Sequence, residues 1–142
     1  MTRIDSNISA IPQDVQVLLH TQVDSFEALR ILLWMHTFRS KRWCESQLQV
    51  QLRLTSALDS ALNSLTAAGL IKSEKEGGEA YYSYAPTTLA LARAVSRLQR
   101  RFKTHPLVIM QLMSNNAIDR VRGSAARAFA DAFLFGKGKP RG

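Results

Sequence analysis

Apolar side chains recur at intervals of three and four residues along most of the chain, a spacing that predicts amphipathic α-helices. In the first half we expect a short helix from Pro12 and further helices at about 25–38, at 44–52 and just before Gly69. In the second half we expect helices at about 88–103, 107–113 and 117–135. The polar run from Ser114 to Asn116 is predicted to break the chain between the last two.

Two short segments, 70–73 and 80–84, flank the turn sequence Glu76-Gly77-Gly78-Glu79. Two short segments joined by a glycine-containing turn are typical of a β-hairpin, and Pro86 is predicted to end the second strand. The predicted fold class is therefore mainly α-helical with a small β-hairpin.

Polar residues mark the expected starts of two helices. Asp24, followed three residues later by Glu27, matches the capping box that begins many helices. Thr55 or Ser56 is predicted to cap the helix that Gly69 ends, because glycine tolerates the left-handed conformation after a helix.

The most specific pattern is the segment from Leu62 to Ile71. Leu62 and Leu65 lie on one helical face, with Leu58 one turn earlier, Gly69 turns the chain, and Leu70 and Ile71 begin the first predicted strand. The order of helix, short helix, turn, helix and hairpin resembles the winged helix-turn-helix superfamily of bacterial regulators, including the MarR and ArsR types. The run 128–133 is similar to the ending of small uncharacterised bacterial winged-helix proteins. A helical hairpin beside an unrelated β-ribbon is the alternative.

The resemblance divides the chain into four expected parts. Residues 1–10 form a flexible N-terminus and residues 11–86 the winged helix-turn-helix domain. Residues 87–135 form a C-terminal helical dimerisation region, and residues 136–142 a disordered basic tail.

Charge is distributed unevenly between the two halves of the chain. The net charge of +8 is the sum of −1 over residues 1–86 and +9 over residues 87–142. Such a basic half favours a polyanionic partner: nucleic acid, a membrane surface or an acidic protein. The apolar run 31–35 is too short to cross a bilayer, and the N-terminus lacks a signal pattern. With Cys44 as the single cysteine, we expect a cytoplasmic protein without membrane insertion.

In DNA-binding members of the superfamily, the helix before the hairpin enters the major groove. The resemblance makes four residues candidates for reading bases: Ser56, Ser60, Asn63 and Ser64. No lysine or arginine lies between Thr55 and Ile71, and Asp59 would repel phosphate. Phosphate contacts are therefore expected from neighbouring segments, with these candidates: Arg39, Lys41, Arg42, Arg53, Lys72 and Lys75.

Two functions remain open at this point. The first is a DNA-binding transcription regulator that acts on double-stranded DNA, and the second is a winged-helix adaptor that binds an acidic protein. A neutral recognition helix suits the second, and each basic side chain taken singly could be an ordinary solvated charge.

The remaining reactive side chains do not indicate a catalytic or metal-binding site. Cys44 stands where a helix cap is expected, and the three histidines lack the spacing of a metal site. Tyr82 and Tyr84 are predicted to pack beneath the hairpin, and Trp43 is predicted to pack at the start of the helix that follows it. We find no catalytic motif, and expect neither enzymatic activity nor a cofactor or metal.

The last two amphipathic helices need partners for their apolar faces. The stripe of the helix at 88–103 consists of Leu91, Val95, Leu98 and Phe102. The stripe of the final helix consists of Ile118, Val121, Ala125, Phe129 and Ala132, with Phe133 beside it. Both could pack on their own domain, but we predict that the final helix pairs with its copy in a homodimer. Arginines outside the stripes could then follow a DNA backbone.

Overall fold

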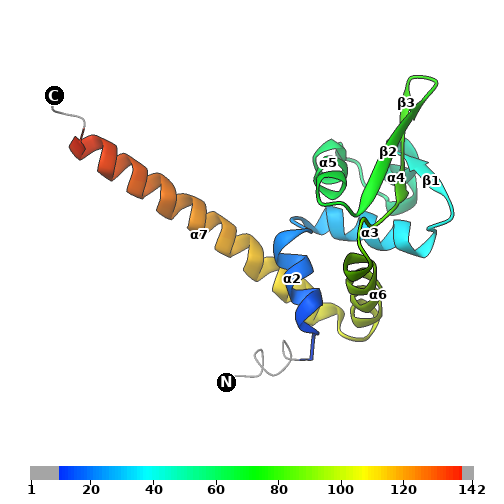
Figure 1. Ribbon diagram of the computed structural model, residues 1–142, viewed down its shortest axis with the longest axis horizontal. Helices are drawn as coiled ribbons and strands as arrows, with labels where there is room; N and C mark the ends of the chain where they lie inside the picture. Colours follow the sequence, from blue (N-terminus) through cyan, green and yellow to red (C-terminus); the bar gives the residue numbers. More distant parts are fainter. Residues whose placement is uncertain (1–9, 139–142) are drawn as a thin grey trace.

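The computed structural model describes the backbone of residues 10–138 and the side chains of residues 10–123. Its first helices are α2 (Gln13–Thr21) and α3 (Phe26–Thr37). They are followed in order by β1 (Arg42–Cys44), α4 (Glu45–Leu52), α5 (Asp59–Ala67), β2 (Ile71–Glu76) and β3 (Glu79–Tyr84). Two helices complete the chain, α6 (Leu89–Thr104) and α7 (Pro106–Gly138). Figure 1 shows a compact body of α2 to α6, from which α7 projects.

The segment from α3 to β3 is a winged helix-turn-helix. The three described strands form one antiparallel sheet in the order β1-β3-β2. Helices α4 and α5 are the helix-turn-helix pair, and we call the β2–β3 hairpin the wing. Its two-residue turn has positive φ at Gly77 and Gly78, 61° and 84°, the conformation that such tight hairpins require. The predicted fold class is confirmed.

The sequence does not predict strand β1. Trp43 pairs with Tyr82 of β3, a residue far along the chain. Three residues carry too little alternation to mark a strand by themselves, so the strand exists only through this distant pairing. Trp43, as predicted, packs against the core, with its ring centroid 5.5 Å from that of Trp34.

The core lies around α3, which packs against α5 on one side and α6 on the other. Every residue of the predicted α5 face is fully buried, namely Leu58, Leu62 and Leu65. The predicted stripe of α6 also packs into this core. Two apolar side chains whose spacing in the sequence predicts burial remain outside this core: Val50 of α4 is 73% exposed and Phe26 of α3 is 43% exposed.

Gly69 ends the α5 region as predicted. Its φ is 79°, and the Leu70 N–H donates to the Leu65 carbonyl at 3.1 Å, a bond typical of a left-handed helix end. A Cβ at position 69 would stand 2.6 Å from Thr87 Oγ1. Both the backbone and the packing therefore require glycine here.

The two predicted caps are replaced by other groups. Helix α3 is capped by Ser25, not Asp24, and Ser25 Oγ accepts from the Ala28 N–H at 3.0 Å. Helix α5 begins at Asp59 with Leu58 in the cap position, so neither Thr55 nor Ser56 caps it. Instead the Leu58 N–H donates to the Glu45 carboxylate at 2.7 Å, a contact supplied by α4.

Helix α7 is continuous through Ser114, Asn115 and Asn116, so the predicted break is wrong. Asn115 Oδ1 accepts from Gln111 Nε2 at 3.0 Å, one turn back, and Asn116 is buried where α7 packs on α2. Tertiary packing thus outweighs the weak helix propensity of this run. The helix extends to Gly138, past the predicted start of the tail at residue 136, and residues 139–142 lie outside the described residues.

No helix in the described part of the chain is long and apolar enough to cross a membrane.

Candidate nucleic-acid interface

Helix α5 presents a short polar face on its exposed side. Ser60 and Asn63 are exposed, and Ser64 is half-buried. Their backbone is held from behind by the buried leucines of the same helix. Two of the predicted base-reading side chains are therefore free to meet a base edge, and Ser64 lies at the margin of that face.

Ser56 does not belong to this face. It lies in the loop before α5, where its hydroxyl donates to Glu27 at 2.9 Å and its carbonyl accepts from Gln49 Nε2 at 2.8 Å. These bonds join the loop to α3 and α4, which explains why Ser56 does not cap α5. Ser56 is therefore a weaker base-reading candidate than the sequence indicated, because its hydroxyl already bonds Glu27.

The amino-terminal end of α5 lies close to the wing. Burial, followed by the carboxylates of Glu45 and Asp59, raises the pKa of the Tyr82 hydroxyl. Tyr82 is on β3, Asp59 begins α5, and Glu45 holds the Leu58 amide. One face of the wing therefore stands beside the start of α5.

Strand pairing assigns each wing cation to a face, because directly paired residues of antiparallel strands share one. Alternation puts Lys75, paired with Ala80, on the face of Tyr82. Arg42 and Lys72 are each paired with Ser83, on the other face. Of these three cations, Lys75 thus shares the face that stands beside α5.

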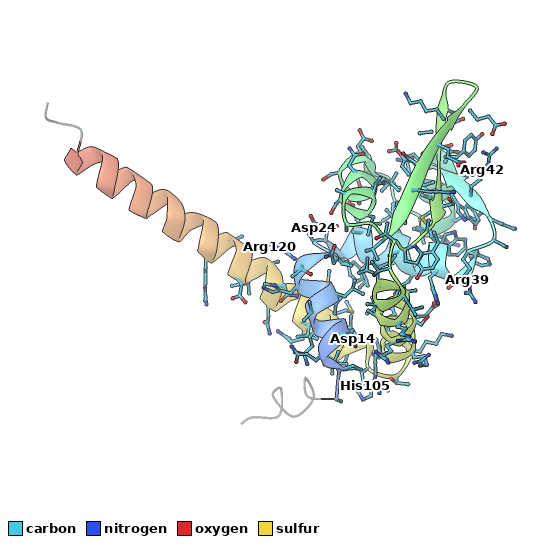
Figure 2. All side chains as sticks on the ribbon, in the orientation of Figure 1. Asp14, Asp24, Arg39, Arg42, His105 and Arg120 are labelled. Atoms are coloured by element: carbon cyan, nitrogen blue, oxygen red, sulfur yellow. The ribbon has the colours of Figure 1, made fainter. Side chains whose placement is uncertain are left out.

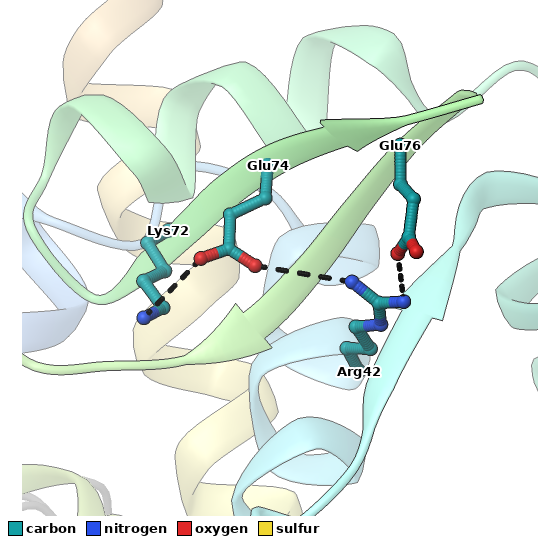
Figure 3. A network of polar contacts seen from close by, with 4 residues as sticks. All are labelled: Arg42, Lys72, Glu74 and Glu76. Carbon is teal, nitrogen blue, oxygen red and sulfur yellow. Dashed lines mark hydrogen bonds and ion pairs between the residues drawn. The ribbon is translucent and has the colours of Figure 1, made fainter. Parts of the chain in front are cut away.

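Carboxylates engage the cations of the outer wing face (Figure 3). Arg42 forms ion pairs with Glu76 and, at 3.9 Å, with Glu74, while Lys72 Nζ lies 3.6 Å from Glu74. The Glu76 contact raises the pKa of the Arg42 guanidinium. Arg42 also stacks on Tyr81, 4.6 Å from its ring centroid. A phosphate would have to compete with these partners, so Arg42 and Lys72 are weaker phosphate candidates than the sequence indicated.

Arg39 and Lys41 lie before β1. Figure 2 places Arg39 and Arg42 on the side of the wing away from α5. Arg39 Nη1 donates to the His36 carbonyl at 2.8 Å, and Lys41 Nζ is 6.0 Å from the centre of the Trp43 ring. Arg39 is therefore not brought to the polar face of α5.

Arg53 occupies the turn between α4 and α5, with an exposed side chain and a left-handed φ of 56°. This conformation is strained for any residue with a Cβ. We expect Arg53→Gly to be more stable than Arg53→Ala by about 1 kcal/mol, because only glycine relieves the strain. Urea unfolding of both variants measures this difference. Equal stability of the two would mean that the turn stores no strain.

Neither cysteine nor histidine chemistry enters the interface. Cys44 is buried in the cap position of α4, and its N–H donates to Gln47 Oε1 at 3.0 Å. Among the described residues, no group of histidine, cysteine, aspartate or glutamate side chains could hold a metal ion. The contacts of Glu27 with Ser56 and of Glu45 with Leu58 were not predictable from the sequence, because they form only when α3 and α4 pack beside the α5 loop.

Comparisons with known proteins find a likeness in structure but no match in sequence. No protein-family model matches the chain, and no curated protein matches it. Among solved structures, HlyU from Vibrio cholerae is similar, with a TM-score of 0.49 and 20% sequence identity. The alignment covers 72% of this chain and 98% of that protein.

Proposed function

We propose that this protein is a DNA-binding transcription regulator of the bacterial winged-helix type, acting as a dimer in the cytoplasm. Helix α5 would enter the major groove with Ser60 and Asn63 toward the bases. Arg53, before α5, and Lys75, on the adjacent wing face, would contact phosphates on either side. The observation that carries this proposal is the exposed polar face of α5, set on a buried apolar face and flanked by the wing.

The arrangement separates the reading of bases from attachment to the backbone. Asparagine can form two hydrogen bonds with adenine, and serine can bond several base edges. Cations, in contrast, bind phosphates of any sequence. Few free cations stand near α5, so we expect modest affinity with a shallow dependence on salt.

Variants of the two groups should affect binding differently. The wild-type chain would first select its preferred duplex from a random pool at low salt. We expect Asn63→Ala to reduce the preference for that duplex over random DNA by about 1–3 kcal/mol. We expect Lys75→Gln and Arg53→Gly to weaken binding to all sequences alike and to lower the salt slope by roughly one unit each. Fluorescence anisotropy over a range of salt concentrations measures both quantities.

Lys72→Gln is the matched control for Lys75→Gln, since it removes the same charge from the other face of the same strand. It should leave the affinity nearly unchanged. Equal losses from both lysine variants would contradict the orientation proposed here. Failure to enrich any duplex sequence would contradict DNA recognition itself.

A second candidate function is an adaptor for an acidic protein. The observation that favours it is the charge near α5, where Asp59 and Glu27 stand at the start of the helix and Arg42 and Lys72 are paired. This face would repel DNA phosphates more than most recognition surfaces. The basic residues of the second half would then bind the partner. In that case the chain binds an acidic protein and shows no preference among duplexes in the selection experiment.

The dimer is proposed from the exposed apolar face of α7. Ile118 is 49% exposed and Val121 is 70% exposed, and the sequence continues their stripe with Ala125, Phe129, Ala132 and Phe133. The side chains of those last four lie outside the described residues. The same face extends back to Leu107 and Met110, exposed by 78% and 40%, and Phe26 lies beside it on α3. These three residues are not among the interface residues predicted from the sequence.

The length of α7 supports a second copy of this chain as the occupant of that face. The helix has 33 residues, about 50 Å, and those of its described side chains that are buried lie within its first third. Arg120 is the last described side chain tied to the body, through bonds to the Asp24 and His20 carbonyls at 3.2 and 3.3 Å. An isolated helical extension of this length is marginal in water. Pairing with a second α7 would cover the apolar face and stabilise the extension.

A further inference from the structure

A cleft opens between the carboxyl end of α3, the end of β3 and one face of α6. It has a volume of about 390 Å³, within the range of small-molecule sites. Figure 1 shows α6 on the side of α3 opposite to α5, so the cleft lies apart from the polar face of α5. The proposed DNA contacts do not use it.

The cleft is lined by three cations that come from two segments. Arg39 follows α3, and Arg100 and Lys103 lie one turn apart on α6. None of the described residues that line the cleft is acidic. Some surface cations outside the cleft are neutralised, as Arg97 is by Asp14. Three cations around one cleft without a lining carboxylate leave its charge uncompensated.

Hydrogen-bonded polar side chains line one part of the cleft. Gln99 Nε2 donates to Thr37 Oγ1 at 2.6 Å, which turns Gln99 Oε1 toward His36 Nδ1 and makes that nitrogen the donor. His36 Nε2 then accepts from Ser96 Oγ at 3.3 Å. Burial is the largest influence on the pKa of His36 and lowers it, so the imidazole is neutral at pH 7. Both ring nitrogens are satisfied, and the ring is fixed.

Tyr84 also lines the cleft and carries an unused hydrogen-bond donor. Its ring packs edge-on against His36, with centroids 5.2 Å apart. Its Oη is buried and has no hydrogen-bond partner in the described part of the chain. Burial also raises the pKa of this hydroxyl, so the proton is retained at neutral pH. A buried donor without an acceptor is costly, and a ligand acceptor would satisfy it.

We propose that this cleft binds a small oxyanion with at least two negative charges. Arg39, Arg100 and Lys103 neutralise the ligand, and the Tyr84 hydroxyl donates to one of its oxygens. Arginine bonds phosphoryl and carboxylate oxygens alike, so the shared chemistry is that of a polyphosphate or a polycarboxylate. The cations come from α6 and the segment after α3, and they share the cleft with the fixed His36 ring and the Tyr84 side chain, which distinguishes the site from cations scattered over a surface.

The test is a titration of the full chain, followed by the amide signals in proton–nitrogen correlation spectra. Inorganic pyrophosphate and citrate are the two probes, each added at constant ionic strength adjusted with sodium chloride. We expect saturable shifts at His36, Tyr84, Gln99 and Arg100 with at least one probe. Saturation by pyrophosphate alone assigns a phosphoryl ligand, and saturation by citrate alone assigns a polycarboxylate. The histidine ring signals should also show a rise in the pKa of His36 on binding.

Variants separate a built site from general charge attraction. We expect Arg100→Gln to weaken binding about tenfold or more, because it removes a charged hydrogen-bond donor. Arg93→Gln is the matched control, since Arg93 is exposed on the same helix and does not line the cleft. Tyr84→Phe removes the hydroxyl and keeps the ring, and should also weaken binding. Absence of saturation with both probes, or equal weakening by Arg93→Gln and Arg100→Gln, would overturn the proposal. No DNA is present, so the result is independent of the proposed function.

Discussion

Replacing Leu62 with alanine should destabilise the protein by about 2–5 kcal/mol, the range for truncating a large buried aliphatic side chain. Leu62 is fully buried on the inner face of α5. The substitution removes contacts with the core around α3 and leaves a cavity that rigid neighbours fill only in part. Urea denaturation of wild type and variant, followed by circular dichroism, measures the free energy of unfolding.

Two other variants show whether the loss comes from packing. Leu62→Met keeps most of the volume and should cost less than about 1.5 kcal/mol. Asn63→Ala changes the next residue on the exposed side and should alter stability by no more than about 0.5 kcal/mol. We thus expect Leu62 to matter for stability and Asn63 for the choice of DNA sequence. Unchanged unfolding of Leu62→Ala would show that the inner face of α5 is wrongly assigned.

Ending the chain after Arg120 should convert a dimer into a monomer and weaken binding to a two-site duplex by roughly 100-fold or more. In a dimer the second half-site is bound at high effective concentration, and a monomer loses that advantage. The truncation keeps the Arg120 contacts with α2 and the loop before α3, so the body should remain folded. Analytical ultracentrifugation at micromolar concentration and binding to one-site and two-site duplexes provide the measurements.

A matched pair of point variants tests the same interface in the full-length chain. Val121→Gln places a polar group on the exposed apolar face of α7, whereas Asp119→Gln changes a neighbour that points away from that face. We expect the first to weaken the dimer and the second to leave it intact. Sedimentation of the wild-type protein as a monomer at micromolar concentration would rule the dimer out, with no effect on the proposed role of α5.

Most of the architecture was accessible from the sequence because it rests on local patterns. Helical spacing placed α2 to α6 within a few residues, and the glycine pair marked the turn of the wing. Gly69 was predictable for the same reason, since a left-handed turn excludes most other residues. The inner face of α5 followed from three leucines at helical spacing.

The features that define the candidate site depend on residues distant in sequence. Ser56 is held by Glu27 of α3, and Arg42 is paired with Glu76 of the wing, contacts that no local spacing indicates. From the sequence, Ser56 was predicted to cap α5 or read bases, and Arg42 to contact phosphate. Their partners are set by how α3, β1 and the wing pack, so the phosphate and base candidates could be divided only in three dimensions.

The sequence by itself determined which segments are helices, where the wing turns, and which faces are apolar, because each depends on a residue's own propensity and its nearest neighbours. Tertiary structure decided that β1 exists, that α7 continues through Asn116 and that Phe26 stays exposed. It also brought Arg39, Tyr84 and Arg100 around one cleft. The three-residue strand and the buried asparagine are stabilised by partners far along the chain. The charge of the cleft likewise comes from residues that are distant in sequence. Only folding brings these partners together.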